Sequence, residues 1–190
     1  MSLGLQLHAA TGLLSGVCQV FSPHHDTRPE GQQPELVIIH GISLPPGEYG
    51  GPGVLQLFTG NLPADAHPYY AGIAALRVSA HLFIRRDGQL LQCVPLHRRA
   101  WHAGVSSFQD RPACNDYSLG IELEGSDDEP YADAQYAALA TVLRLLQQHW
   151  PLLQGERIVG HSDVAPGRKS DPGPAFDWLR LRALIDRPNP

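Results

Sequence analysis

The sequence lacks the features of several large protein classes. No apolar run approaches the ~20 residues that a membrane-spanning helix requires. The first 16 residues contain neither Lys nor Arg, so the positively charged start of a secretory signal peptide is missing. With 14 basic and 19 acidic residues, the chain has no general basic field to attract nucleic acid or an anionic membrane. We therefore expect a cytoplasmic protein with no nucleic-acid or membrane partner, and we predict no obligate protein partner.

Cysteine is scarce, and several common motifs are missing. Cys18, Cys93 and Cys114 are odd in number, which favours reduced thiols over a disulfide framework, and their spacing matches no zinc knuckle or redox pair. The chain also has no His-Glu-x-x-His helix, no Gly-x-x-x-x-Gly-Lys phosphate loop and no Gly-x-Gly-x-x-Gly fingerprint. These absences argue against the common metalloprotease, nucleotide-binding and dehydrogenase motifs.

The composition is that of an ordinary globular domain. The 43% of hydrophobic and 17% of charged residues exclude wholesale disorder, and 190 residues suit one domain with a full core. We find neither an internal repeat nor a linker. We therefore expect residues 1–190 to form a single domain.

Hydrophobic patterns predict strands interspersed with helices. The apolar run 36–40 is typical of a buried strand, and 118–124 alternates as a strand does. Apolar residues at 133–150 keep helical spacing. We also expect short helices at 54–58 and 70–76, and a hairpin of strands 77–85 and 90–94. A final helix is expected from about 174. This order predicts an α/β domain in which helices flank a mixed sheet.

Ten histidines are more than usual for this length, and one of them lies in a loop rich in reactive groups. The loop runs from Gly160 to Gly173 and carries His161, Asp163, Lys169 and Asp171. Its prolines and glycines favour an ordered loop over a helix or strand. Imidazole and carboxylate groups are ligands that zinc accepts. The loop supplies at most two ligands, so a third must come from elsewhere.

The favoured third ligand is His40, at the open end of the strand 36–40. Two imidazoles, one carboxylate and a water would complete a tetrahedral catalytic site. A core histidine bonded to backbone is the alternative interpretation of His40, and His81 is the competing ligand. His102 is interpreted as a cleft-wall residue. Five further histidines are interpreted as surface residues: His8, His24, His25, His67 and His149.

A metal-dependent hydrolase also needs a proton acceptor. Glu122 can serve as general base on a metal-bound water if its face of the strand lines the cleft. Otherwise it points to solvent, which is the interpretation that we favour for Glu124. Lys169 could donate a hydrogen bond to the oxyanion that forms when water attacks a carbonyl. An ordinary surface lysine is the alternative.

Several motifs in fixed order resemble one known family. The resemblance extends from about Ser22 to Leu184, and its motifs lie at 36–52, 66–73, 76–81, 99–106, 120–125 and 169–174. With them the chain resembles the zinc N-acetylmuramoyl-L-alanine amidases of type 2. That family also includes phage T7-type lysozyme amidases and peptidoglycan recognition proteins. The resemblance implies a domain core of about 22–185, with a mixed sheet flanked by helices and a zinc cleft on one face.

The same resemblance implies roles for the candidate residues. By position, His40, His161 and Asp171 correspond to the Zn²⁺ ligands, and Glu122 and Lys169 to the catalytic pair. The resemblance also implies that Arg77 and Trp101 contact the substrate. It places His81 in the cleft, but not as a metal ligand.

Two positions depart from the family's pattern. Gly41 follows His40 where the family usually has an asparagine, and Ala113 stands where an arginine precedes Cys-Asn-Asp. Both lie toward the substrate in relatives, so we expect the stem-peptide contacts to differ while the metal chemistry stays the same.

The implied activity is hydrolysis of the amide between (1,6-anhydro-)N-acetylmuramic acid and L-alanine in muropeptides. The resemblance places this reaction in cytoplasmic cell-wall recycling, with indirect control of β-lactamase induction and a small-molecule partner, the anhydro-muropeptide. Two alternatives stay open. One is a muropeptide-binding module without catalysis, and the other is an amidase that acts on intact peptidoglycan.

Overall fold

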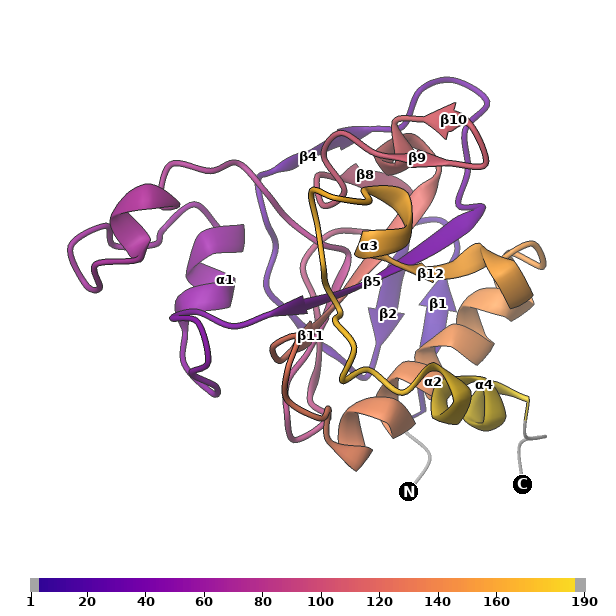
Figure 1. Cartoon of the computed structure of the whole chain (residues 1–190). Helices are drawn as coiled ribbons and strands as arrows, with labels where there is room; N and C mark the ends of the chain where they lie inside the picture. The colour runs from indigo at the N-terminus through magenta and orange to yellow at the C-terminus, as the bar shows by residue number, and fades with distance from the viewer. Residues whose placement is uncertain (1–3, 187–190) are drawn as a thin grey trace.

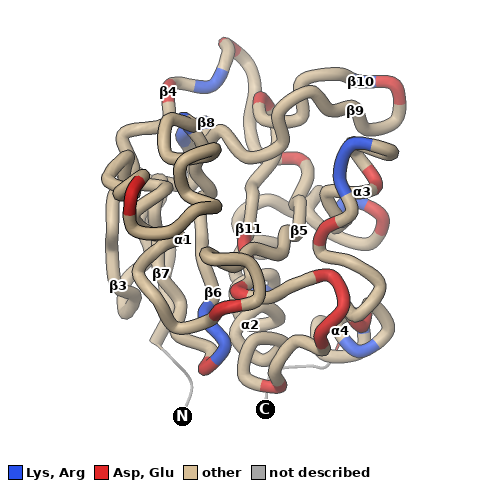
Figure 2. The backbone as a smooth tube through the Cα atoms, turned by 60° about the vertical axis from the view of Figure 1, so that its left-hand side comes forward, with Lys and Arg blue, Asp and Glu red and all other residues tan. Residues whose placement is uncertain are grey.

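A mixed sheet lies at the centre of the computed structural model, which describes residues 4–186. In spatial order its six strands are β12 (Ile158–Gly160), β5 (Leu36–Ile42), β11 (Ser118–Glu124), β6 (Leu82–Ile84), β7 (Leu90–Gln92) and β3 (Cys18–Gln19). Figure 2 shows this order from β3 on the left to β5. Strands β12, β5, β11 and β6 are parallel, β7 is antiparallel to β6, and β3 is parallel to β7. The domain therefore has the mixed sheet that the sequence predicts.

The parallel pair β5 and β11 forms the middle of the sheet. All residues of β11 and the first five of β5 are buried, because both faces of the sheet are covered. The register places Glu122 opposite His40, and Gly160 of β12 opposite Ile39. Three parallel strands therefore end side by side, with polar residues at or just after their carboxyl ends.

One face of the sheet is covered by α2 (Asp133–His149), against which α4 (Trp178–Ile185) packs, as Figure 1 shows. The Gln135 side chain accepts the N–H of Ala132 at the start of α2 and donates to carbonyls of β6 and β11. The helix ends before Pro151, since a residue that precedes proline disfavours helical geometry. The buried face of α2 and the sheet form one large core, which includes Val37, Ile39, Leu119, Ile121, Leu123, Tyr136, Leu139, Leu143 and Leu146.

The opposite face carries two smaller cores instead of one. The first packs α1 (Gly53–Phe58) and the 3₁₀ helix η1 (Tyr70–Gly72) against Phe83 and Leu91. The second packs α3 (His161–Val164) against Leu36 and Ile38. His40 and Glu122 belong to this face by strand alternation, because their neighbours Ile39, Ile121 and Leu123 point into the large core.

Short elements complete the described chain. Strands β1 (Gln6–His8) and β2 (Leu13–Ser15) pair antiparallel, as do β4 (His25–Thr27) with β8 (Arg98–Ala100) and β9 (Ser107–Phe108) with β10 (Arg111–Pro112). Two further 3₁₀ helices are η2 (Cys114–Asp116) and η3 (Gly155–Arg157). Between residues 4 and 186, none of the helices has the length and apolar character that crossing a bilayer requires.

The structure corrects the extent of several expected elements. The strand expected at 77–85 is confined to β6, and the helix expected at 70–76 is the three-residue η1. The last helix begins at Trp178, where the Asp177 side chain accepts the N–H of Arg180, and not near Pro174. Residues 161–164 form the one-turn helix α3, although we expected no helix in this loop. Pro166 lies beyond that turn and does not prevent it.

Candidate active site and metal centre

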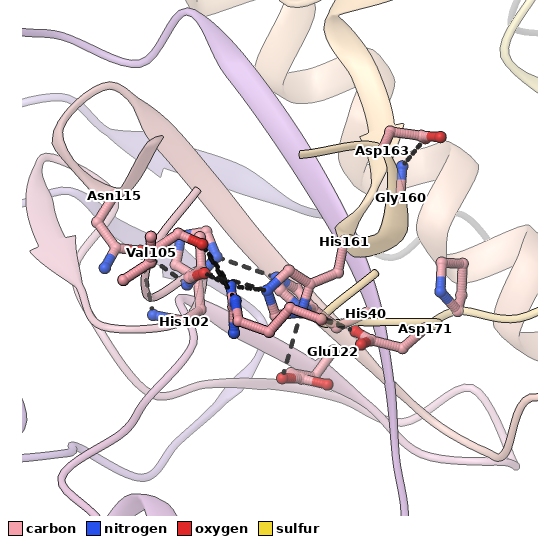
Figure 3. Close-up of polar contacts among 12 residues, drawn as sticks. His40, His102, Val105, Asn115, Glu122, Gly160, His161, Asp163 and Asp171 are labelled. Carbon is pink, nitrogen blue, oxygen red and sulfur yellow. Dashed lines mark hydrogen bonds and ion pairs between the residues drawn. The ribbon is translucent and has the colours of Figure 1, made fainter. Parts of the chain in front are cut away.

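Three side chains from two distant parts of the chain converge near the carboxyl ends of β5 and β12 (Figure 3). His40 lies on β5, His161 begins α3 directly after β12, and Asp171 lies further along the same loop. Nδ1 of His40 is 3.0 Å from Nδ1 of His161 and 3.1 Å from Oδ2 of Asp171. Nδ1 of His161 is also 3.1 Å from that oxygen. The three atoms therefore form a nearly equilateral triangle.

This triangle has the size and chemistry of a zinc site. Zinc bonds of about 2.0–2.2 Å in a tetrahedral arrangement place neighbouring ligand atoms about 3.3 Å apart. An atom of the triangle that carries no proton can only accept a hydrogen bond. One N–H group could therefore donate along one or two sides of the triangle, and the remaining side would join two acceptors. A cation at the centre would satisfy all three atoms at once. The residues present therefore fit a zinc ion.

The second ring nitrogen of His161 determines which nitrogen faces the triangle. Nε2 is 3.2 Å from the carbonyl oxygen of Ala103, which can only accept. Donation to this carbonyl, which is closer than the Arg168 guanidinium at 3.5 Å, would require a proton on Nε2 and leave a lone pair on Nδ1 of a neutral ring. Arg168 donates to the same carbonyl and to that of Val105, and so holds this acceptor in place. Nδ1 of His161 is thereby free to bind a metal.

The protonation states of the cluster also suit a metal. Burial lowers the pKa of His40 to about 4, although its contact with Asp171 partly offsets the effect, so this imidazole is neutral at pH 7. Burial raises the pKa of Asp171, but the contacts with His161 and His40 outweigh that effect and hold the pKa well below its usual range. Neutral imidazole and ionised carboxylate are the forms that coordinate zinc.

Glu122 lies next to this cluster on the neighbouring strand (Figure 3). Its Oε1 is 4.0 Å from Nδ1 of His40, and its Oε2 is buried without a hydrogen-bond partner among the described residues. Burial raises the pKa of Glu122 well above its usual value, Asp171 raises it further, and Lys169 opposes both. A buried carboxylate with a free oxygen and a raised pKa is a candidate proton acceptor.

Lys169 is the only lysine in the sequence and lies exposed on the loop between α3 and Asp171. Its positive charge lowers the pKa of both Glu122 and His40, so the ammonium group influences the cluster from solvent. Two contacts hold the loop in place, one at Lys169 and one at the residue before it. The N–H of Lys169 donates to the carbonyl of Ala165, and the side chain of Arg168 donates to the carbonyl of Ala103.

The two predicted substrate-contact residues lie on neighbouring segments. The N–H of Ser79 donates to the carbonyl of Trp101, so the segment that follows Arg77 runs beside Trp101. Arg77 is exposed, and Trp101 is half-buried with its ring stacked on His24 at 6.2 Å between centroids. Both are accessible to a ligand, and their role stays a prediction.

The interpretation of His81 as a cleft residue is wrong. Its side chain is completely buried, Nδ1 accepts the N–H of Gly120, and Nε2 is 3.0 Å from the carbonyl of Arg98. Burial and the nearby guanidinium of Arg28 lower the pKa of His81 to about 3. His81 is therefore a neutral core histidine.

Two further interpretations of single residues are also wrong. Glu124 does not point to solvent, because it is 2% exposed and accepts the N–H groups of Gly50 and Arg86. It thereby ties the long loop after β5 to the end of β6. His24 is not a surface residue, since it is buried beneath Trp101.

Tyr131 is a site residue that sequence reasoning missed. Its hydroxyl donates to the carbonyl of Pro172, directly after Asp171. A Cβ on Gly41 would overlap that hydroxyl, so the glycine after His40 leaves room for Tyr131. The available signal was the glycine itself, at a position where the family pattern has a larger residue.

Comparisons with known proteins place the chain beside a family of amidases. The family model for N-acetylmuramoyl-L-alanine amidases matches residues 30–174, a span that includes every candidate site residue. The chain is 56% identical over 174 residues to the 1,6-anhydro-N-acetylmuramyl-L-alanine amidase AmpD of Citrobacter freundii, which covers 92% of both chains.

Solved structures show the same fold. A crystal structure of a selenomethionine derivative of AmpD is 55% identical, with a TM-score of 0.91 over 94% of this chain and 98% of the other. The amidase AmiD from E. coli, in complex with the substrate anhydro-N-acetylmuramic acid-L-Ala-D-γ-Glu-L-Lys, is 26% identical. Its TM-score is 0.59 over 83% of this chain and 60% of the other.

Proposed function

The chain belongs to the N-acetylmuramoyl-L-alanine amidase family, and on this premise we propose that it is a zinc-dependent amidase of muropeptide recycling. The bond that it hydrolyses is the amide between (1,6-anhydro-)N-acetylmuramic acid and L-alanine of the stem peptide. The names of relatives that match nearly the whole chain support this substrate.

His40, His161 and Asp171 would hold the zinc ion. The observation that carries this assignment is the triangle of their ligand atoms, with sides of 3.0, 3.1 and 3.1 Å. When bound, the ion supplies Lewis acidity that polarises the amide carbonyl and lowers the pKa of a water.

Glu122 would act as general base and then as general acid. Its free Oε2 takes a proton from the attacking water, and the same carboxyl delivers a proton to the departing amine of L-alanine. Lys169 would donate to the oxyanion that develops on the carbonyl oxygen. Because its ammonium group is exposed, it can reach substrate without breaking an existing ion pair among the described residues.

We assign substrate contact to Arg77 and Trp101. The exposed guanidinium of Arg77 suits a stem-peptide carboxylate, and the half-buried indole of Trp101 offers an apolar surface to the sugar or peptide. The structure of AmiD with an anhydro-muropeptide supports a small-molecule substrate for this fold.

The proposal includes the cytoplasm as the site of action, with indirect control of β-lactamase induction through the turnover of anhydro-muropeptides. Cys18, Cys93 and Cys114 are all free thiols, which supports a reducing compartment.

The experiment that tests the substrate compares anhydro-muropeptide with polymeric peptidoglycan, each with the zinc-loaded protein. We expect release of stem peptide with a free L-alanine amine from the anhydro-muropeptide, and far slower release from the polymer. Equal rates on both would favour an amidase of intact wall. Binding of anhydro-muropeptide without release of peptide would favour a recognition module.

A further inference from the structure

His102 lies behind the candidate ligand His40, on the side away from the triangle (Figure 3). Nδ1 of His102 is 3.0 Å from Nε2 of His40, and Nε2 of His102 is 3.2 Å from the hydroxyl of Ser118. Among residues 4–186, this is the hydrogen-bond contact that Nε2 of His40 makes. The three groups form a row that leads away from the site into the protein.

The row has one arrangement of protons that is compatible with a metal. A metal on Nδ1 of His40 requires the proton of that ring to sit on Nε2, and this N–H must then donate. Within the described part of the chain its hydrogen-bond partner is Nδ1 of His102, which must therefore accept. His102 in turn carries its proton on Nε2 and donates to Ser118.

The surrounding chain is shaped to hold His102 in this position. A Cβ on Gly120 would overlap the imidazole of His102, so the ring occupies the place of a side chain on β11. From the other side, Oδ1 of Asn115 accepts the N–H groups of His102 and Ala103, at 3.2 and 2.8 Å. These contacts fix both the ring and the backbone that carries it.

The same short segment serves both histidines of the triangle. His102 faces Nε2 of His40 through its ring, and Ala103 faces Nε2 of His161 through its carbonyl. Partners of this kind set the orientation and tautomer of histidine ligands, and their loss typically weakens metal binding ~10–100-fold.

We propose that His102 is a positioning residue that fixes His40 with Nδ1 toward the metal by accepting the hydrogen bond of its Nε2–H. The inference rests on the proposed zinc function and adds a residue that contacts neither metal nor substrate. His102 is partly exposed, so its interpretation as a cleft-wall residue stays a prediction, and its contacts with His40, Ser118 and Gly120 add the positioning role.

The test uses two substitutions that each keep one half of the row. In His102→Asn, the side-chain oxygen can replace Nδ1 and keep the contact with His40, while the contact with Ser118 is lost. In His102→Gln, the longer side chain can replace Nε2 and keep the contact with Ser118, while His40 loses its acceptor. Both variants replace the imidazole ring with a side-chain amide and lose one of its two hydrogen bonds. A difference between them therefore reports which hydrogen bond was lost.

The measurement is the Kd of zinc by chelator competition in wild type and both variants, with the Tm of each metal-free protein. We expect His102→Gln to bind zinc ~10–100-fold more weakly than wild type and His102→Asn to bind at least about tenfold more tightly than His102→Gln. In the zinc-loaded protein, the proton NMR signal of the His40 Nε2–H should persist in wild type and His102→Asn and be lost in His102→Gln.

Two results would overturn the inference and leave the proposed function standing: equal Kd values for the two variants, or a Kd order that follows the Tm order alone. A wild-type protein that binds no zinc, or that hydrolyses substrate fully without it, would instead overturn the proposed function.

Discussion

The two faces of the central sheet differ in how their side chains are satisfied. On the α2 face, apolar strand and helix side chains meet in one continuous core, and the buried side chain of Gln135 is hydrogen-bonded. On the opposite face, two smaller cores leave the ends of β5 and β11 to buried polar groups. Near these groups, ligand atoms of His40, His161 and the half-buried Asp171 lie close together, and Oε2 of Glu122 has no hydrogen-bond partner among the described residues.

The difference implies that the α2 face mainly stabilises the fold and the opposite face mainly provides the reactive groups. Burial of apolar surface on the α2 face lowers the free energy of the folded state. Burial of unpaired polar groups on the opposite face raises it, because each has lost its hydrogen bonds with water. A protein retains such groups where a bound metal or substrate satisfies them. Substitutions on the two faces should therefore change different measured quantities.

The largest expected effect that leaves both the fold and the metal in place is that of Glu122→Gln. This change keeps the shape of the side chain and removes the proton acceptor, so kcat should fall ~10²–10⁴-fold while KM changes little. Zinc content should stay at the wild-type level. Steady-state kinetics on anhydro-muropeptide with metal analysis checks both.

The exposed Glu129 provides the matched control. Glu129→Gln removes one negative charge from the surface and should leave kcat unchanged. Near-normal kcat in zinc-loaded Glu122→Gln would mean that another group accepts the proton. Glu124 is unsuitable as a control, since its carboxylate is buried and hydrogen-bonded.

On the α2 face, Leu143→Ala should act on stability instead. Leu143 is completely buried in the large core, and truncation of a buried leucine typically costs ~2–5 kcal/mol in the free energy of unfolding. Below the unfolding transition, the Kd of zinc and kcat should match wild type. Chemical denaturation and zinc titration of the same sample measure the two quantities.

Gln148→Ala on the exposed side of the same helix is the control, and it should change stability by less than about 0.5 kcal/mol. A Leu143→Ala protein that stays stable but loses zinc affinity would contradict the expectation that the α2 face affects stability and not metal binding.

A smaller effect on activity is expected for Lys169→Met. Loss of one oxyanion donor typically lowers kcat ~10²–10³-fold, and zinc content and stability should be retained because the side chain is exposed. Lys169→Arg, which keeps the positive charge, should retain more activity than Lys169→Met. Equal kcat values for Lys169→Met and wild type would assign Lys169 to the surface.

The sequence alone predicted the α2 face well. Apolar residues at helical spacing predicted α2 almost to its last residue, and the apolar run after Glu35 and the alternation of 118–124 predicted β5 and β11. These elements are set by periodicity, which is local. The start of α4 and the single turn of α3 were not predicted, because a side-chain cap or a one-turn helix produces no periodic pattern in the sequence.

The opposite face was predicted in part. The expected meeting of His40, His161 and Asp171 is present, because strand ends and a turn-rich loop mark where polar groups gather. Their role as ligands stays a prediction. The burial of Glu124 and His81 and the contact of His102 with His40 could not be predicted, since each depends on which loop lies over the strand.

Zinc titration of the metal-free protein tests whether His40, His161 and Asp171 form one catalytic zinc site. Activity on anhydro-muropeptide should rise linearly and stop at one zinc per chain, and His161→Ala should neither bind zinc at these concentrations nor gain activity. Full activity of the metal-free wild type, or one tightly bound zinc in His161→Ala, would contradict the account.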